Sequence, residues 1–226
     1  MAKPMFIRSA KRRFNFTMAR LLFGDKSTAP HFALVGPGSA NHLCQRIVES
    51  GHQRVLIVTD KPLRELGLVD QACETLIKAG IDLVWYDGVQ PDPTFTQVRE
   101  GAQILREQAC TAILAVGGGS SMDAAKIIAA TLDSSDDPES WAGINKAPET
   151  AAPLYAIPTT AGTGSEATMG AVITHEGDQS KVVISGAALL PVAVALDSNL
   201  LLALPPAITA ATGLDALTHG VEAYIG

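Results

Sequence analysis

The chain has 226 residues, of which 47% are hydrophobic and 18% charged, a composition typical of a globular protein with material for one large core or two modest ones. Its net charge of −6 is uneven, because residues 1–20 contain six basic side chains and no acidic one, which leaves −12 on the other 206 residues. No apolar run approaches the roughly 18 residues that a membrane span needs. We therefore expect neither a membrane nor a nucleic acid as a partner.

We interpret residues 1–30 as a basic N-terminal arm. Its composition partly matches an organelle transit peptide, but we favour an arm that packs on the acidic body or on a neighbouring subunit. The cysteines are odd in number, far apart and without a C-x-x-C pair, so we expect buried, reduced thiols at Cys44, Cys73 and Cys110. Reduced thiols favour a reducing compartment, and we predict that the protein is cytoplasmic.

From residue 31 to residue 108 the sequence predicts alternating strands and helices. The run Val55–Thr59 is typical of a central parallel strand that is buried on both faces, and Gly51 and Gly80 mark helix ends. The alternation indicates βαβ units. The predicted strands are His31–Val35, Val55–Thr59 and Leu83–Tyr86, and the predicted helices run from Ser39 or Asn41 to Glu49, from Leu66 to Ala79 and from Phe95 to Gln108.

From residue 112 on, the sequence predicts further buried strands, a β-hairpin and a final helix in which Pro206 suits the first turn. The predicted fold class is α/β, with a Rossmann-like parallel sheet flanked by helices and accompanied by the hairpin, followed by the start of an all-helical domain. The predicted elements are strand Ala112–Val116, helix Ser121–Leu132, strand Leu154–Ile157, hairpin strands Ala171–Thr174 and Lys181–Ile184, strand Val192–Leu196, and a helix that continues to Ile225.

A run of three glycines follows the predicted strand Ala112–Val116. Gly117–Gly119 have no Cβ to keep an anion from the backbone N–H groups, and Ser120 is predicted to cap a helix that begins near Ser121. Asp123 in the first helical turn suits the helix dipole. The stretch predicts a phosphate cradle, although it departs from the G-x-G-x-x-G spacing of dinucleotide folds and, by itself, equally suits a tight turn.

A second loop of small residues follows the predicted strand Leu154–Ile157. It runs from Thr159 to Glu166 and consists mainly of hydroxyl residues and glycines. Open α/β sheets bind ligands at the carboxyl ends of their strands, where this loop would lie. The loop is therefore a second predicted part of a ligand site, with a plain connection as the alternative.

Asp215 and His219 are four residues apart in the last predicted helix, which places a carboxylate and an imidazole on one face. Oxygen and nitrogen donors suit zinc, Fe(II), nickel or manganese and argue against a thiolate structural site. An ordinary Asp–His contact is the alternative, and two ligands are too few for a complete metal site. The remaining histidines are interpreted as surface or packing residues: His31, His42, His52 and His175.

Three stretches, taken together in order and spacing, resemble the iron-containing (group III) alcohol dehydrogenases: Gly117–Lys126, Pro158–Glu166 and Thr212–His219. The resemblance covers the chain from residue 31 on. It implies a nucleotide-binding α/β domain at residues 31–203, and a metal-binding helical domain whose first helix lies at residues 204–226. It also implies NAD and a divalent metal between the two, with Fe(II) as the first choice and zinc as the second.

The resemblance also implies roles for individual residues. Asp60 follows a predicted strand, where a carboxylate would accept hydrogen bonds from ribose hydroxyls and repel a 2′-phosphate, so we predict NAD rather than NADP. A helix-capping aspartate is the alternative. Carried over by position, Asp60 meets the adenosine ribose, Gly118, Gly119 and Ser120 hold the pyrophosphate, Asp123 lies in that loop's helix, Thr159, Thr160 and Thr163 face the cofactor, Lys181 reaches its ribose, and Asp215 and His219 are the first two metal ligands.

The activity implied by the resemblance is hydride transfer between a primary alcohol or diol and NAD. We also expect a homodimer or higher homo-oligomer, because nothing in the predicted fold covers the apolar face of the last helix, formed by Leu214, Leu217, Val221 and Ile225. The family's other two metal ligands are histidines further along the helical domain, so we expect this chain to be the first part of a longer enzyme and to be inactive alone. No residue is assigned as the proton acceptor, and the identity of the alcohol stays open.

Two alternatives stay open at this point. One keeps the fold and changes the chemistry, as in a zinc glycerol dehydrogenase-like or a metal-free maleylacetate reductase-like relative. The pair Asp215 and His219 disfavours the metal-free option. The other alternative is a non-catalytic nucleotide-binding module.

Overall fold

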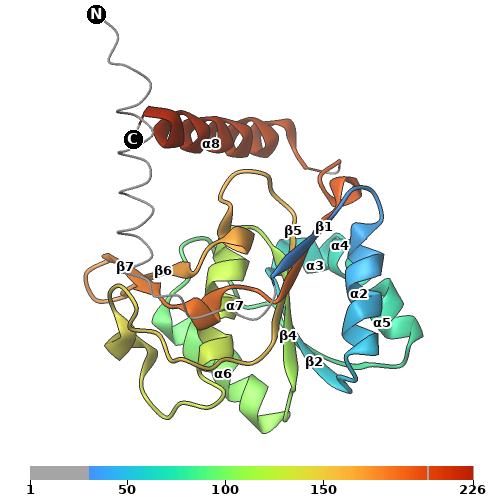
Figure 1. Cartoon of the computed structure of the whole chain (residues 1–226), viewed down its shortest axis with the longest axis horizontal. Helices are drawn as coiled ribbons and strands as arrows, with labels where there is room; N and C mark the ends of the chain where they lie inside the picture. The colour runs from blue at the N-terminus through green and yellow to red at the C-terminus, as the bar shows by residue number, and fades with distance from the viewer. Residues whose placement is uncertain (1–30, 203, 226) are drawn as a thin grey trace, which may run out of the picture.

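A six-stranded parallel sheet forms the centre of the structure, a computed structural model that describes residues 31–202 and 204–225 (Figure 1). The strand order is β1-β8-β5-β4-β2-β3. Helical crossovers join the neighbours β2 and β3 and the neighbours β4 and β5, whereas the chain forms a hairpin between β5 and β8. This confirms the predicted α/β class, while the interpretation of residues 1–30 falls outside the described residues. The strands are β1 (Phe32–Val35), β2 (Arg54–Val58), β3 (Asp82–Tyr86), β4 (Ala112–Gly117), β5 (Leu154–Pro158) and β8 (Ala193–Leu196).

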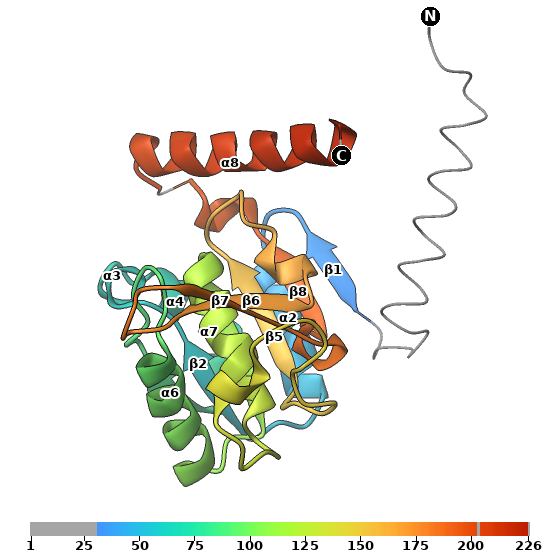
Figure 2. The same ribbon diagram turned by 90° about the vertical axis from the view of Figure 1, so that its left-hand side faces the viewer.

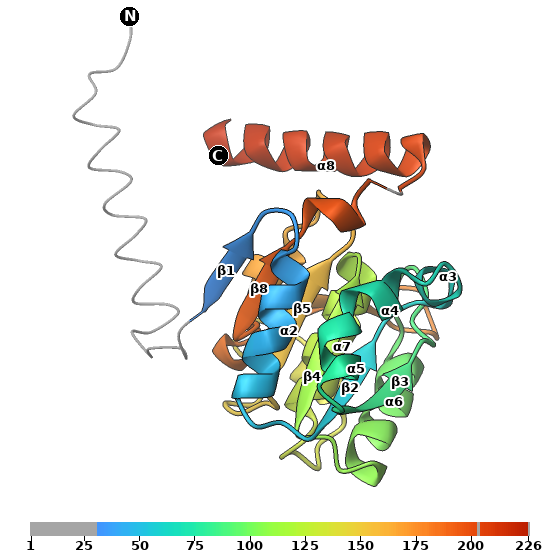
Figure 3. The same ribbon diagram turned by 90° about the vertical axis from the view of Figure 1, so that its right-hand side faces the viewer.

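Helices cover both faces of the sheet (Figures 1 and 3). A hydrophobic core lies on each face of the sheet, and strand β4 contributes side chains to both. Ile113 and Ala115 pack on one face and Leu114 and Val116 on the other, all with no solvent exposure. Burying one such aliphatic side chain contributes about 1.5–3 kcal/mol. One face carries α6 (Phe95–Glu107) and α7 (Gly119–Ala130), and the other carries α2 (Ser39–Glu49), α3 (Lys61–Glu65), α4 (Leu68–Ala72) and α5 (Glu74–Lys78).

The single helix predicted from Leu66 to Ala79 is wrong, because the structure has three short helices between residues 61 and 78. Gly67 adopts a left-handed conformation with φ of 71° and separates α3 from α4. Cys73, with ψ of 4°, separates α4 from α5. The apolar spacing of this stretch predicts one helix, but a glycine with positive φ ends a helical turn at low cost.

The predicted hairpin is present as the antiparallel strands β6 (Gly170–Thr174) and β7 (Lys181–Ser185), which lie beside α7 (Figure 2). Its turn is tied to the start of α6, where the Thr96 amide donates to Glu176 Oε1 at 2.9 Å. Thr94 and Gln97 form a capping box at the same helix end. The remaining short segments are the 3₁₀ turns η1 (Pro138–Trp141), η2 (Ser165–Ala167), η3 (Ala187–Leu189) and η4 (Ser198–Leu200).

The last helix, α8 (Pro206–Ile225), passes across the edge of the sheet at which the strands end (Figures 1 to 3). None of its described side chains is buried, and Leu214, Leu217 and Val221 are exposed. Thr212 and Asp215 are the half-buried positions on this helix. In the part of the chain that the structure describes, no helix has the length and apolar character to cross a membrane.

Candidate functional site

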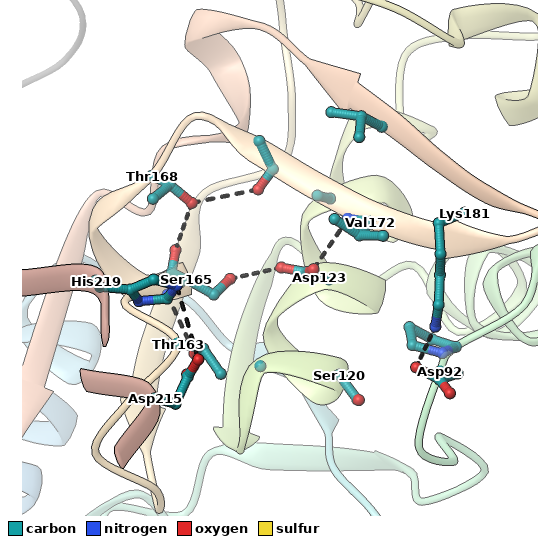
Figure 4. Close-up of a pocket in the computed structure, with 15 residues that line it drawn as sticks. Asp92, Ser120, Asp123, Thr163, Ser165, Thr168, Val172, Lys181, Asp215 and His219 are labelled. Carbon is teal, nitrogen blue, oxygen red and sulfur yellow. Dashed lines mark hydrogen bonds and ion pairs between the residues drawn. The ribbon is translucent and has the colours of Figure 1, made fainter. Parts of the chain in front are cut away.

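A pocket of about 470 Å³ lies at the carboxyl ends of β4 and β5 (Figure 4). Its walls are the start of α7, the loop after β5, the hairpin strands, the turn at Asp92 and Pro93, and one face of α8. Parallel sheets bind ligands at this edge, because several strand ends and helix N-termini meet there. The glycine run and the second small-residue loop therefore converge on one cavity.

Helix α7 presents its N-terminus to this pocket. The helix begins at Gly119, with Gly118 in an extended conformation as the N-cap residue and its carbonyl accepting from the Met122 amide at 3.2 Å. The prediction that Ser120 caps a helix beginning near Ser121 is wrong, since Ser120 lies within the first turn and lines the pocket. Because Gly118 has no side chain to occupy the helix end, the first N–H groups remain suited to an anion.

The second loop packs directly on the glycines. A Cβ at Gly119 would lie 2.8 Å from Thr163 Cγ2, and a Cβ at Gly118 would lie 3.3 Å from Thr160 Oγ1. Gly119 therefore admits no larger residue unless the Thr163 side chain moves. Thr159 is buried, and its amide donates to the Gly117 carbonyl at 2.9 Å, which continues the pairing of β5 with β4.

Asp123 is more enclosed than the sequence indicated. Its Oδ1 accepts from the Ser165 hydroxyl at 2.6 Å and its Oδ2 from the Val172 amide at 2.9 Å (Figure 4). Burial raises the pKa of Asp123, against the opposing effects of Lys126 and of these two hydrogen bonds. The carboxylate thus joins α7 to both the second loop and the hairpin, while it also lines the pocket.

Lys181 lies on β7 and lines the pocket opposite α7. Its ammonium pairs with Asp92, from the turn before α6 (Figure 4). The same ammonium is 3.4 Å from Thr174 Oγ1. Both members of the pair are exposed, so the attraction between them is weakened by solvent. Lys181 is therefore placed where it could reach a ligand in the pocket.

Asp60 follows β2 at the same edge of the sheet and is half-buried, but it does not line the pocket. Its Oδ1 accepts from the Leu63 amide at 2.9 Å and caps α3. Burial raises the pKa of Asp60, and the hydrogen bond from Leu63 opposes this. The capping role that the sequence left as an alternative is present in the structure, and a role at a ribose stays a prediction.

Asp215 and His219 project from α8 toward the pocket (Figure 4). His219 Nε2 lies 3.7 Å from Asp215 Oδ1, and His219 Nδ1 is 3.2 Å from the Gly162 carbonyl oxygen. A hydrogen bond from Nδ1–H to a carbonyl leaves Nε2 as the acceptor, which is the arrangement of many metal-binding histidines. Among the described residues, no third His, Cys, Asp or Glu joins this pair as a group that could hold a metal.

The structure thus brings seven of the predicted site residues to one pocket, namely Gly119, Ser120, Asp123, Thr163, Lys181, Asp215 and His219. Sequence reasoning missed Lys126, a fully buried lysine, together with its partners Ser165 and Thr168. A signal for it existed, since Lys126 follows Asp123 by three residues in a helix that is otherwise alanine and isoleucine at that point. The predicted reduced cysteines Cys44, Cys73 and Cys110 are buried and free.

Comparison with known proteins identifies the group of proteins that this chain is similar to. The sequence profile of the family described as iron-containing alcohol dehydrogenase matches residues 30–198. Alcohol dehydrogenase 4 of Schizosaccharomyces pombe is 40% identical over 196 residues, which cover 87% of this chain and 46% of that protein. The NAD-dependent methanol dehydrogenase of Bacillus methanolicus is 36% identical over 196 residues, with 87% and 51% of the two chains covered.

The fold agrees with the sequence comparison. A solved structure of 1,3-propanediol oxidoreductase matches with a TM-score of 0.83 and 40% identity, over 87% of this chain and 51% of that one. The chain spans about half the length of the curated relatives it matches.

Proposed function

Because the chain belongs to the iron-containing alcohol dehydrogenase family, we propose that it forms the nucleotide-binding part of an NAD-dependent, metal-dependent alcohol dehydrogenase. The reaction would transfer hydride between a primary alcohol or diol and NAD, giving an aldehyde or ketone. The observation that carries this proposal is the convergence of three separate segments on one pocket: the start of α7, the loop after β5 and the Asp215–His219 face of α8.

The described residues fit a dinucleotide. Gly118 and Gly119 lie at a helix end that attracts anions, and Gly119 has no space for a Cβ, as expected where backbone must approach a phosphate closely. Thr163 and Lys181 would then orient the rest of the cofactor from the loop and the hairpin. When bound, NAD supplies the hydride acceptor, and these side chains bind and orient it beside the substrate.

Asp215 and His219 fit part of a divalent metal site. Their oxygen and nitrogen donors suit Fe(II) or zinc. The contact of His219 Nδ1 with the Gly162 carbonyl oxygen leaves Nε2 on the side of Asp215. A metal held there would supply Lewis-acid chemistry that makes the hydroxyl of a bound alcohol more acidic. Asp215 and His219 would bind it, and the pocket beside them would position the alcohol near the cofactor.

The proposal extends to the substrate, the compartment and the assembly of the protein. The partner would be a small alcohol or aldehyde, the compartment would be the cytoplasm, as three free buried cysteines favour, and the assembly would be a homodimer or higher homo-oligomer. The exposed apolar side chains of α8, among them Leu214 and Leu217, support self-association or coverage by another helical segment.

Replacement of Gly119 tests the cradle. Gly119→Val should abolish NADH binding, because its Cβ would already lie 2.8 Å from Thr163 Cγ2 and the branched side chain would fill the approach of a phosphate. Titration with NADH, followed by nicotinamide fluorescence, measures the effect. Gly220→Val on exposed α8, where a Cβ meets nothing within 4 Å, is the matched control and should bind like the wild type. Unchanged affinity of Gly119→Val would leave the loop as an ordinary turn.

A further inference from the structure

Lys126 is a fully buried lysine with three hydrogen-bond acceptors. Its Nζ donates to Ser165 Oγ at 2.9 Å, Thr168 Oγ1 at 3.0 Å and the Gly170 carbonyl at 2.7 Å. Three acceptors match the three donors of an ammonium group. The acceptors all belong to one stretch of six residues, which includes η2 and leads into β6.

Asp123, one turn earlier on α7, binds the same stretch. It accepts from the Ser165 hydroxyl and from the Val172 amide, and its Oδ1 lies 3.9 Å from Lys126 Nζ. One turn of α7 therefore makes five hydrogen bonds to residues 165–172. The Ser165 hydroxyl accepts from Lys126 and donates to Asp123, so the three side chains form one connected network.

Burial of this charge is expensive for the protein. Desolvation lowers the pKa of Lys126 to about 8, although Asp123 and Glu166 favour the ammonium form. An apolar side chain of similar length would pack in the same helix at lower cost, since charged groups removed from water recover that cost only through well-placed partners. In exchange for this cost, the hydrogen bonds of the buried ammonium fix the conformation of the segment 165–172.

That segment is a wall of the pocket. Ser165, Thr168, Gly170 and Val172 all line it, and Thr163, which packs on Gly119, precedes the segment by two residues. The Ser165 amide donates to Thr163 Oγ1 at 3.3 Å, which continues the connection from the network to the glycine cradle (Figure 4). Lys126 itself does not line the pocket.

We propose that Lys126 is a positioning residue for the dinucleotide site: without touching the cofactor, it holds residues 165–172 against α7 and thereby keeps Thr163 in place over Gly119. This inference rests on the proposed function, because it assumes that the pocket takes a dinucleotide. It predicts that loss of the ammonium loosens one wall of the pocket and weakens cofactor binding, while the sheet stays folded.

The first measurement is amide hydrogen exchange in the protein without cofactor. In Lys126→Met, which keeps an unbranched side chain and removes the ammonium, residues 163–172 should exchange at least about 10-fold faster while β4 stays protected. Lys78→Met is the matched control, because Lys78 is exposed on α5 and pairs only with the exposed Glu74 among the ion pairs of the described residues. Lys78→Met should change the exchange rate of neither residues 163–172 nor β4. Equal protection of residues 163–172 in Lys126→Met and wild type would overturn the proposal.

The second measurement is NADH affinity at a temperature where each variant is folded by circular dichroism. Lys126→Met should raise the Kd about 10-fold or more, whereas a lysine with a merely structural role would lower Tm and leave Kd unchanged. Thr168→Val removes one acceptor with little change of shape, and it should speed exchange of residues 163–172 by a smaller factor even if Lys126→Met fails to fold. Because Thr168 also lines the pocket, this faster exchange in the protein without cofactor, together with a raised Kd, is the expected result. Failure of the wild type to bind NADH would remove the proposed function, whereas wild-type binding with unchanged Kd in Thr168→Val and in any folded Lys126→Met would remove only this inference.

Discussion

Asp60 shows that one side chain can satisfy the backbone and still be placed for a ligand. One carboxylate oxygen caps α3, and the residue lies where a parallel strand ends at the ligand edge of the sheet. A capping role requires an oxygen acceptor but no charge, whereas repulsion of a 2′-phosphate requires the charge. The two roles can therefore be separated by substitution.

Asp60→Asn removes the charge of this side chain and keeps an oxygen acceptor. The variant should keep α3 capped, since asparagine caps helices as well as aspartate does, and should relax the preference for NADH over NADPH. Fluorescence titration with both reduced cofactors gives the ratio of the two Kd values, and thermal unfolding reports the cap. Equal affinity of the wild type for NADPH and NADH would show that Asp60 does not select the cofactor.

Lys126 should make stability depend on pH in a definite direction. Its pKa is about 8 in the folded chain, below the ordinary 10.5 that applies when the chain is unfolded, so the unfolded state binds more protons between these values. The cost of the buried ammonium is complete below pH 8 and declines as pH rises toward 10.5. Buried thiols act oppositely, because burial raises the pKa of Cys44 to about 12.

The contribution of Lys126 to this pH dependence is isolated by comparing wild type with Lys126→Met. The free energy of unfolding of wild type, measured relative to Lys126→Met, should rise by about 1 kcal/mol between pH 7 and pH 9. Urea unfolding at several pH values measures it, and the cysteines cancel because both proteins contain them. A relative stability that falls over this range would show that the folded-state pKa of Lys126 is not lowered.

At the scale of elements, the site depends on how closely α8 approaches the loop after β5. A Cβ at Gly162 would lie 2.6 Å from the Thr212 carbonyl oxygen and 3.0 Å from Asp215 Oδ2. The first of these is backbone, which cannot move aside as a flexible side chain can. The small residue at position 162 therefore lets the helix with Asp215 and His219 approach the loop after β5.

Enlarging that residue should separate the two elements. Gly162→Ala should displace α8 and break the contact between His219 Nδ1 and the Gly162 carbonyl, because the new methyl group would occupy the space of Thr212. Nitrogen NMR of the His219 ring should then lose the signature of a single preferred tautomer. Gly213→Ala, where a Cβ meets nothing within 4 Å, is the control and should stabilise α8 by up to about 1 kcal/mol. An unchanged His219 spectrum in Gly162→Ala would contradict the contact.

At the scale of the whole molecule, cofactor binding and metal binding should differ in strength. The proposed pyrophosphate site at Gly118 and Gly119 and the pocket walls beside it lie mostly in the α/β part of the chain. The proposed metal pair, Asp215 and His219, has side chains that are 43% and 52% exposed, and no third partner joins it in the described part of the chain. Two ligands leave most positions around a metal to water and give it no dry surroundings.

We therefore predict that the 226-residue chain binds NADH but retains well below one divalent metal ion per chain after dialysis, and oxidises no primary alcohol or diol. Elemental analysis and NAD reduction with a panel of alcohols measure both properties. Asp215→Ala should leave NADH affinity unchanged and serves as the control for residual metal. Stoichiometric metal with turnover would show that the site is complete within these residues.

The sequence by itself determined the class of fold and most of the elements. Buried parallel strands such as β4 are continuous apolar runs, and helices such as α6 begin at recognisable caps, so local composition was sufficient for them. It also placed the glycine run, the second loop and the Asp215–His219 pair, because their geometry depends on neighbours within about one turn or one strand end.

Only the tertiary structure decided how these segments meet. The partners of Lys126 lie 39 to 44 residues away in sequence, and the distance from Gly162 to His219 is 57 residues, so no local pattern could indicate either contact. The start of α7 at Gly119 and the division of residues 61–78 into three helices likewise depend on backbone conformations that packing selects. Local preferences are set by near neighbours, whereas the shape of the pocket is set by burial of groups that only the folded chain brings together.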